Sequence, residues 1–111
     1  ITAEDIYYED IAIPVSVYTY RMPNLRVPAL LKYYLENQTE VHIEGQTVGA
    51  ALADLSQKFP KIHSHIFDNN GKVRRHINLF VNADNIRDLN GLDTLVGEAD
   101  VVKILPSVTG G

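Results

Sequence analysis

The chain has 111 residues, of which 45% are hydrophobic and 22% are charged. That length suits one domain, and the composition excludes a chain that is disordered throughout. No apolar run approaches the ~20 residues that a membrane helix needs, and no basic stretch followed by an apolar run resembles a secretory signal. Cysteine is absent, which excludes disulfides and thiolate metal sites, and we expect a cytoplasmic protein.

The net charge of −4 is segregated along the sequence. No Lys or Arg precedes Arg21, whereas from residue 11 onward ten acids balance ten bases. The excess comes from four acids in the first ten residues: Glu4, Asp5, Glu9 and Asp10. A neutral domain without a basic stripe is a poor ligand for phosphates, so we expect neither a nucleic-acid nor a membrane partner. One basic cluster, at Lys72, Arg74 and Arg75, is more typical of a solvated loop.

The first half of the chain contains two predicted strands and one convincing helix. Residues 11–20 and 39–43 alternate apolar and polar side chains with the period of half-buried strands. Between them, prolines break the pattern, and residues 30–35 form either a helical turn or a loop. Thr47 is a good N-cap residue, and Pro60 should end the helix. The apolar positions of that helix have helical spacing: Val48, Leu52, Leu55 and Phe59.

The second half predicts strands separated by turns. Residues 61–75 are polar and turn-rich, and residues 77–81 alternate as a strand. A very short strand fits near 85–86, and the last strand, 101–105, is closed by Pro106. The fold class is therefore α+β: one mixed sheet of four to five strands packed on one main helix, with the first and last strands side by side. We divide the chain into an acidic extension (1–11), this domain (12–106) and a flexible tail (107–111).

Two glycines end the sequence. The five residues after Pro106 can extend ~16–18 Å, which is enough to carry the carboxylate of Gly111 into another protein's active site. Because glycine has no side chain, a narrow channel can close around Gly110 and Gly111. Glycine-rich ends also occur without any function.

The ending Leu-Pro-Ser-Val-Thr-Gly-Gly resembles that of the MoaD/ThiS family of sulfur carriers, which have the ubiquitin-like β-grasp fold. The resemblance covers about residues 12–111. Its segments are 47–52, 73–82, 85–87, 91–94 and 100–102. The connection 61–75 is similar to that of the longer members, which serve cysteine biosynthesis. Ala99 departs from the family's usual glycine, and the acidic extension lies outside the pattern.

This resemblance implies a protein that acts through partners. A ubiquitin-activating-type enzyme, using ATP and Mg²⁺, would adenylate Gly111. A sulfurtransferase or a sulfide source would then convert it to a thiocarboxylate, which donates sulfur to an acceptor enzyme in cysteine or cofactor biosynthesis. The chain would be a co-substrate rather than an enzyme and would bind no cofactor itself. Three alternatives stay open: the small subunit of molybdopterin synthase, a ubiquitin-like modifier, and an interaction module with an inert tail.

Strand alternation predicts a docking patch near the tail. Tyr18, Phe80 and Leu105 would face outward on neighbouring strands. Contiguous apolar patches mark partner sites, although single exposed apolar residues are normal. The predicted partner-binding residues are Tyr18, Phe80, Leu105, Val108, Thr109 and Gly110, and Gly111 is the reacting group.

Other candidate sites have simpler explanations. His63, His65 and His76 with Asp68 suggest a metal site, but their spacing places no two of them one helical turn apart, so we expect a surface loop and no metal. Asp84, Asp88 and Asp93 lie in a turn region, where aspartate is favoured for its backbone hydrogen bonds. We expect His42 to be exposed on its strand.

Overall fold

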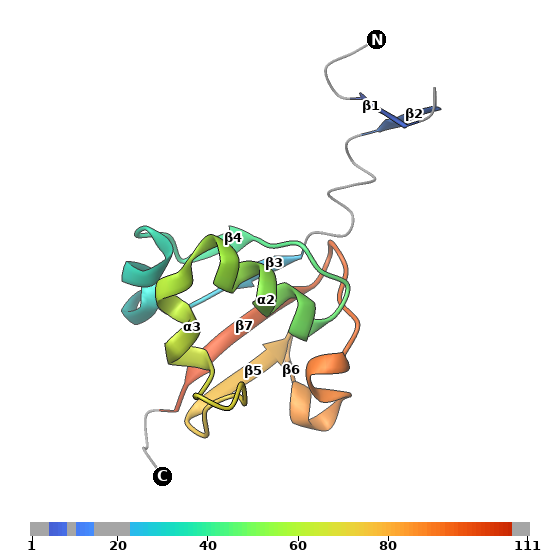
Figure 1. Cartoon of the computed structure of the whole chain (residues 1–111). Coiled ribbons are helices and arrows are strands. Elements are labelled where there is room, and N and C mark those ends of the chain that lie inside the picture. Colours follow the sequence, from blue (N-terminus) through green and yellow to red (C-terminus); the bar gives the residue numbers. More distant parts are fainter. Residues whose placement is uncertain (1–4, 9–10, 15–22, 108–111) are drawn as a thin grey trace.

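A five-stranded mixed sheet organises the chain in the computed structural model, which describes residues 5–8, 11–14 and 23–107 (Figure 1). The strands lie in the order β4-β3-β7-β5-β6. Their bounds are Asn24–Arg26 for β3, Glu40–His42 for β4, Ile77–Val81 for β5, Asp84–Asn85 for β6 and Val101–Pro106 for β7. β3 is parallel to β7, and the other pairs are antiparallel. The α+β class and the mixed sheet are therefore confirmed.

Two α-helices lie over one face of this sheet (Figure 1). They are α2 (Val48–Lys58) and α3 (Pro60–Ile66), and three 3₁₀ helices join the remaining segments: η1 (Ala29–Leu35), η2 (Ile86–Asp88) and η3 (Gly91–Asp93). Of the described helices, none combines the length and apolar character needed to cross a membrane.

The strand beside β7 is not the segment that the sequence predicts. Alternation favours residues 11–20, but the parallel partner of β7 is β3, with Leu25 opposite Val102. Ile11–Pro14 instead forms β2 and pairs with β1 (Asp5–Tyr8) in a separate two-stranded sheet. The prediction was wrong because alternation shows that a segment can be a strand and does not say which strand it pairs with. The proposed domain boundary at residue 12 stays a prediction.

The core lies between the helices and the sheet. Ile77, Leu79 and Val81 point to the buried face of β5, as their alternation predicts, and Val102 and Ile104 do the same on β7. The helical contribution is equally apolar and fully buried: Val48, Ala51, Leu52, Leu55, Ile62 and Ile66. Burying a leucine or isoleucine side chain contributes about 1.5–3 kcal/mol, so this layer supplies much of the driving force for folding.

The helix boundaries follow from capping chemistry. Thr47 is the N-cap of α2, since its backbone is extended and its Oγ1 accepts a hydrogen bond from the N–H of Ala50 at 3.1 Å. Pro60 ends α2 as predicted, but it also occupies the first turn of α3, where its missing N–H costs nothing. The prediction of a polar, turn-rich stretch was therefore wrong for the first part of 61–75. Ile62 and Ile66, one helical turn apart and both buried, anchor α3 on the core.

A charged group fixes the loop before α2. The carboxylate of Asp54, on α2, accepts the N–H of Glu44 at 2.8 Å and lies 2.9 Å from Lys58 Nζ. Burial raises the pKa of Asp54, but the hydrogen bond from Glu44 and the charge of Lys58 outweigh it, so the pKa lies below 3.8. Because the pKa of Asp54 is lower in the folded than in the unfolded state, its carboxylate stabilises the fold at pH values above the unfolded pKa. This stabilisation is lost as the pH falls through the folded pKa.

We expect Asp54→Asn to lower the free energy of unfolding by about 0.5–1.5 kcal/mol at pH 7, because the charge-assisted contacts are weakened. The difference from the parent protein should shrink when the pH is lowered from 7 to about 2, because the stabilisation due to a depressed pKa is lost as the pH falls through the folded pKa of Asp54. Denaturant unfolding at both pH values measures this. The matched control is Asp88→Asn, which removes an exposed carboxylate that forms no hydrogen bond or ion pair with another described side chain. If the free energy of unfolding depends on pH equally in the two variants, the carboxylate of Asp54 does not have this stabilising role.

Candidate functional site

The C-terminal tail begins where β7, the central strand of the sheet, ends at Pro106 (Figure 1). β7 lies between β3 and β5, and its last residue, Pro106, pairs with Ile77, the first residue of β5. The N–H of Ser107 then donates to the carbonyl of His76 at 2.6 Å. The base of the tail is thereby held against the start of β5, so that the residues beyond it begin from a defined point.

One face of the sheet has no described helix over it, and two of the predicted docking residues lie there. In the antiparallel register of β5 and β7, Phe80 is opposite Lys103, and Asn78 is opposite Leu105. Paired residues share a face, so Phe80 and Leu105 are diagonal neighbours with Cβ atoms about 7–8 Å apart. Leu105 is 39% exposed and Phe80 is partly exposed. The structure thus brings these two residues together, with Leu105 directly before Pro106 and Phe80 further from the end of β7.

The rest of the predicted patch is not described by the structure. Tyr18, Val108, Thr109, Gly110 and Gly111 lie outside the described residues, and their roles stay predictions. The neighbouring positions of β3 on the open face are the polar Asn24 and Arg26, and Arg26 is opposite Lys103. Arg26 is in turn 3.5 Å from Glu40 on β4. On the described open face, Phe80 and Leu105 therefore adjoin the polar Asn78 and Lys103, and the face is charged toward β4.

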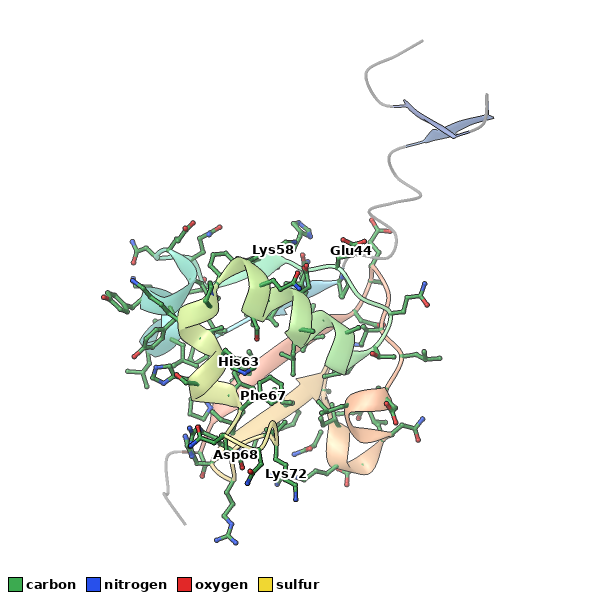
Figure 2. All side chains as sticks on the ribbon, viewed as in Figure 1. Glu44, Lys58, His63, Phe67, Asp68 and Lys72 are labelled. Carbon is green, nitrogen blue, oxygen red and sulfur yellow. The ribbon has the colours of Figure 1, made fainter. Side chains whose placement is uncertain are left out.

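The loop between α3 and β5 is a turn held by hydrogen bonds, in which Phe67, Asp68 and Lys72 lie close together (Figure 2). Phe67 and Val73 form a short antiparallel bridge, and the carboxylate of Asp68 accepts the N–H groups of Asn70 and Lys72 at 2.8 and 3.0 Å. These two hydrogen bonds, with help from nearby Arg74 and Lys72, hold the pKa of Asp68 below its usual value. Asp68 is therefore explained as a turn residue and not as a metal ligand.

The histidines also have structural partners. His63 lies on α3, where its Nδ1 shares a hydrogen bond of 2.9 Å with Ser56 Oγ and its ring packs on Phe67. The His65 ring lies 4.0 Å from the ring of Tyr34. Within residues 5–8, 11–14 and 23–107, no group of three His, Cys, Asp or Glu side chains could hold a metal ion. The expected surface loop is corrected to a helix for His63 and His65, and His42 is exposed on β4 as predicted.

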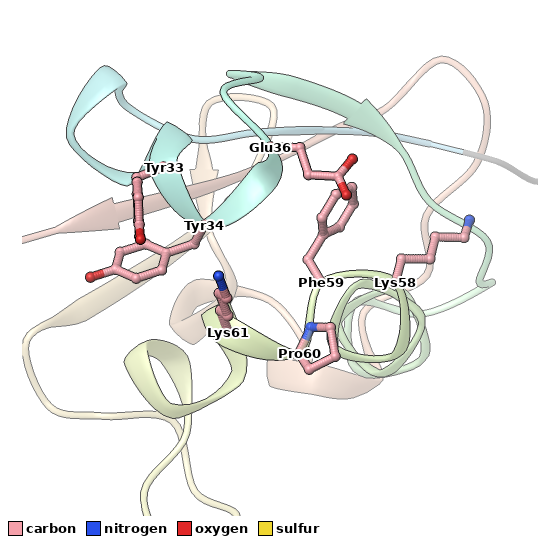
Figure 3. Close-up of a pocket in the computed structure, with 7 residues that line it drawn as sticks. All are labelled: Tyr33, Tyr34, Glu36, Lys58, Phe59, Pro60 and Lys61. Atoms are coloured by element: carbon pink, nitrogen blue, oxygen red, sulfur yellow. The ribbon is translucent and has the colours of Figure 1, made fainter.

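A shallow hollow of about 160 Å³ lies between η1 and the junction of α2 and α3 (Figure 3). Its wall is aromatic and cationic: Tyr33, Tyr34, Glu36, Lys58, Phe59, Pro60 and Lys61. Lys61 Nζ lies 5.8 Å from the centre of the Tyr33 ring, and Lys58 is already paired with Asp54. This hollow contains no pair of acid and base, nor any nucleophile, in a catalytic arrangement.

The mixed sheet packs against helices, and its central strand, β7, is parallel to β3, the first strand of the sheet along the chain. This arrangement defines a ubiquitin-like β-grasp protein. The model of the ThiS family matches residues 25–111, and the chain belongs to that family. This confirms the family resemblance. The matched span begins within β3, which agrees with the role of β3 as the first strand of the sheet.

Two relatives share about a third of their residues with this chain. A protein named sulfur carrier protein CysO from Mycobacterium tuberculosis is 34% identical over 87 residues, covering 77% of this chain and 94% of the relative. A putative sulfur carrier protein from Archaeoglobus fulgidus is 36% identical over 87 residues, covering 78% and 96%. These names describe carrier proteins rather than enzymes, which agrees with the expectation that this chain is not an enzyme.

Solved structures agree on the fold. The complex of BexX and CysO from Amycolatopsis orientalis contains a chain that matches with a TM-score of 0.71 and 28% identity, covering 79% of this chain and 98% of that one. Small archaeal modifier protein 1 from Methanosarcina acetivorans matches with a TM-score of 0.72 and 31% identity, covering 81% and 98%. The ubiquitin-like fold is therefore shared by proteins named as carriers and by a protein named as a modifier.

Proposed function

We propose that this chain is a sulfur carrier that works through the carboxylate of Gly111. The observation that carries the proposal is the family match, which runs through Gly111 and includes the Gly-Gly ending. The described geometry supports it, because β7 is the central strand and presents the partly exposed Leu105, with Phe80 as its diagonal neighbour, just before the tail begins. The chain would act in the cytoplasm as a co-substrate and bind no cofactor of its own.

The chemistry explains why a partner is needed. A carboxylate oxygen is a poor leaving group, so one oxygen of Gly111 would attack the α-phosphorus of ATP and displace pyrophosphate. The partner is an adenylating enzyme of the ubiquitin-activating type that holds ATP and Mg²⁺. Hydrosulfide then attacks the carbonyl carbon, AMP leaves with the activated oxygen, and a thiocarboxylate remains. Its sulfur is a good nucleophile near neutral pH and passes to an acceptor enzyme in cysteine or cofactor biosynthesis.

The test is the intact mass of the protein after incubation with ATP, sulfide and the adenylating enzyme of its source organism. We expect a gain equal to the replacement of one oxygen by sulfur, and no gain when ATP is omitted. An unchanged mass, with an enzyme shown to be active on another carrier, would overturn the proposal. Copurification with a larger subunit in fixed stoichiometry would instead indicate the small subunit of molybdopterin synthase.

A ubiquitin-like modifier is the second candidate, favoured by the similarity to small archaeal modifier protein 1. In that case Gly111 would form an isopeptide bond with a lysine of a target protein. Conjugates of higher mass in cell extracts, absent from cells that express a chain without Gly111, would support this function. A thiocarboxylate without such conjugates would favour the carrier.

A further inference from the structure

The base of the tail lies against the end of a loop that carries positive charges. Ile77 is the partner of Pro106, and Ser107 is bonded to His76, so Arg75 comes just before the strand residue that holds the base of the tail. Chain geometry limits the distance between the Cα atoms of Arg75 and Pro106 to at most about 13 Å. The guanidinium of Arg75, exposed at the surface, is therefore within reach of anything that touches the tail base.

The charge of the folded chain is strongly polarised around this point. Residues 58–76 contain five Lys or Arg and one Asp, together with three histidines, whereas residues 84–100 contain five Asp or Glu and one Arg. The first segment includes α3 and the loop before β5, on the same side as the end of β7 in Figure 1. The second segment includes η2 and η3, at the other side of β5. A net charge near zero from residue 11 onward conceals this separation.

One cation near the base of the tail is available for a partner. Two ion pairs occur among the described residues, Arg26 with Glu40 and Lys58 with Asp54, and neither uses the loop. Arg74 is committed to the fold, since its Nε donates to the carbonyl of Ser64 at 2.6 Å. Lys72 lies close to the carboxylate of Asp68, whereas Arg75 is exposed and forms no ion pair with a carboxylate of the described residues. The charge of Arg75 is therefore open to solvent close to the base of the tail.

Because the tail is short, a partner that acts on it must come close to Arg75. Five residues after Pro106 reach ~16–18 Å, so a partner that acts on Gly111 must bring the rim of its channel close to the base of the tail. We infer that Arg75 docks on an acidic rim of the adenylating enzyme. This inference rests on the proposed function and adds the chemistry of the partner's surface. Opposite charges on the two proteins accelerate their association and orient it. The acidic segment 84–100 would be repelled from the same acidic rim.

The test compares two charge reversals of the same kind. Arg75→Glu reverses a cation beside the tail, and Arg87→Glu reverses an exposed cation on η2, away from it. Pyrophosphate release is measured with ATP, sulfide and the adenylating enzyme at low salt and at 1 M salt. We expect Arg75→Glu to raise KM about tenfold at low salt while kcat changes less than twofold, because docking and not chemistry is affected. At 1 M salt, where the screening length falls to about 3 Å, the difference should largely disappear.

Further variants separate charge from shape and from the proposed function. Arg75→Lys should behave like the parent protein, and thermal unfolding should be unchanged in all three variants because the side chain is exposed. Equal KM values for Arg75→Glu and Arg87→Glu, or a loss confined to kcat, would overturn the inference while the parent protein is still activated. If the parent protein itself gains no sulfur, the proposed function fails and the inference falls with it.

Discussion

Gly45→Ala is expected to lower the free energy of unfolding by about 3–5 kcal/mol, because it combines a backbone clash with an unfavourable backbone angle. Gly45 lies in the turn between β4 and α2 and has a φ of +158°. A Cβ atom at this position would lie 2.5 Å from the backbone N of Ala51 and 2.8 Å from the carbonyl carbon of Ala50. Both neighbours belong to the first turn of α2 and cannot move without disturbing the helix. Denaturant unfolding measures the loss.

Gly71→Ala is the matched control for this prediction. Gly71 also has a positive φ, +78°, but an added Cβ would meet nothing within 4 Å. The same substitution should therefore cost only about 1 kcal/mol, from the backbone angle alone. If the two variants unfold at the same denaturant concentration, the close approach of the turn to α2 is not what makes Gly45 necessary. A Gly45→Ala chain that fails to fold while Gly71→Ala folds would agree with the expected order.

The fold class was predictable because each core element repeats its own apolar period. Alternation defined β5 and β7, and the helical spacing after Thr47 defined α2. β3 was missed because the four residues between Pro23 and Pro28 contain only two alternating buried positions, Leu25 and Val27, which is too short a pattern to define a strand. α3 was missed because its polar residues outnumber Ile62 and Ile66, although their spacing of four was a usable signal.

The candidate site was predictable where it depends on side-chain direction. Alternation alone places Phe80 and Leu105 on the outer face of their strands, and the structure adds the register that makes them neighbours. The proximity of Arg75 to the tail could not be predicted from the sequence. It depends on the pairing of Ile77 with Pro106, a contact between residues 29 positions apart, and no local pattern specifies it.

Gly110→Ala is expected to lower kcat/KM for activation by about 30- to 150-fold, a loss of about 2–3 kcal/mol of transition-state binding. In the proposed function, a channel of the adenylating enzyme closes around the backbone of the tail, and even a methyl group would press on its wall. Deleting Gly111 should abolish the gain of sulfur altogether, because the carboxylate would then end one residue short of the reacting phosphorus. Pyrophosphate release and intact mass measure the two effects.

Gly97→Ala makes the same chemical change outside the tail and serves as the matched control. An added Cβ at Gly97 would meet nothing within 4 Å, so both stability and activation should stay close to those of the parent protein. Thermal unfolding of Gly110→Ala should be unchanged too, since the alanine follows the last strand and leaves the core intact. A Gly110→Ala chain that is activated as fast as Gly97→Ala would show that the partner does not enclose the tail. A chain without Gly111 that still gains sulfur would place the acceptor carboxylate elsewhere and overturn the carrier mechanism.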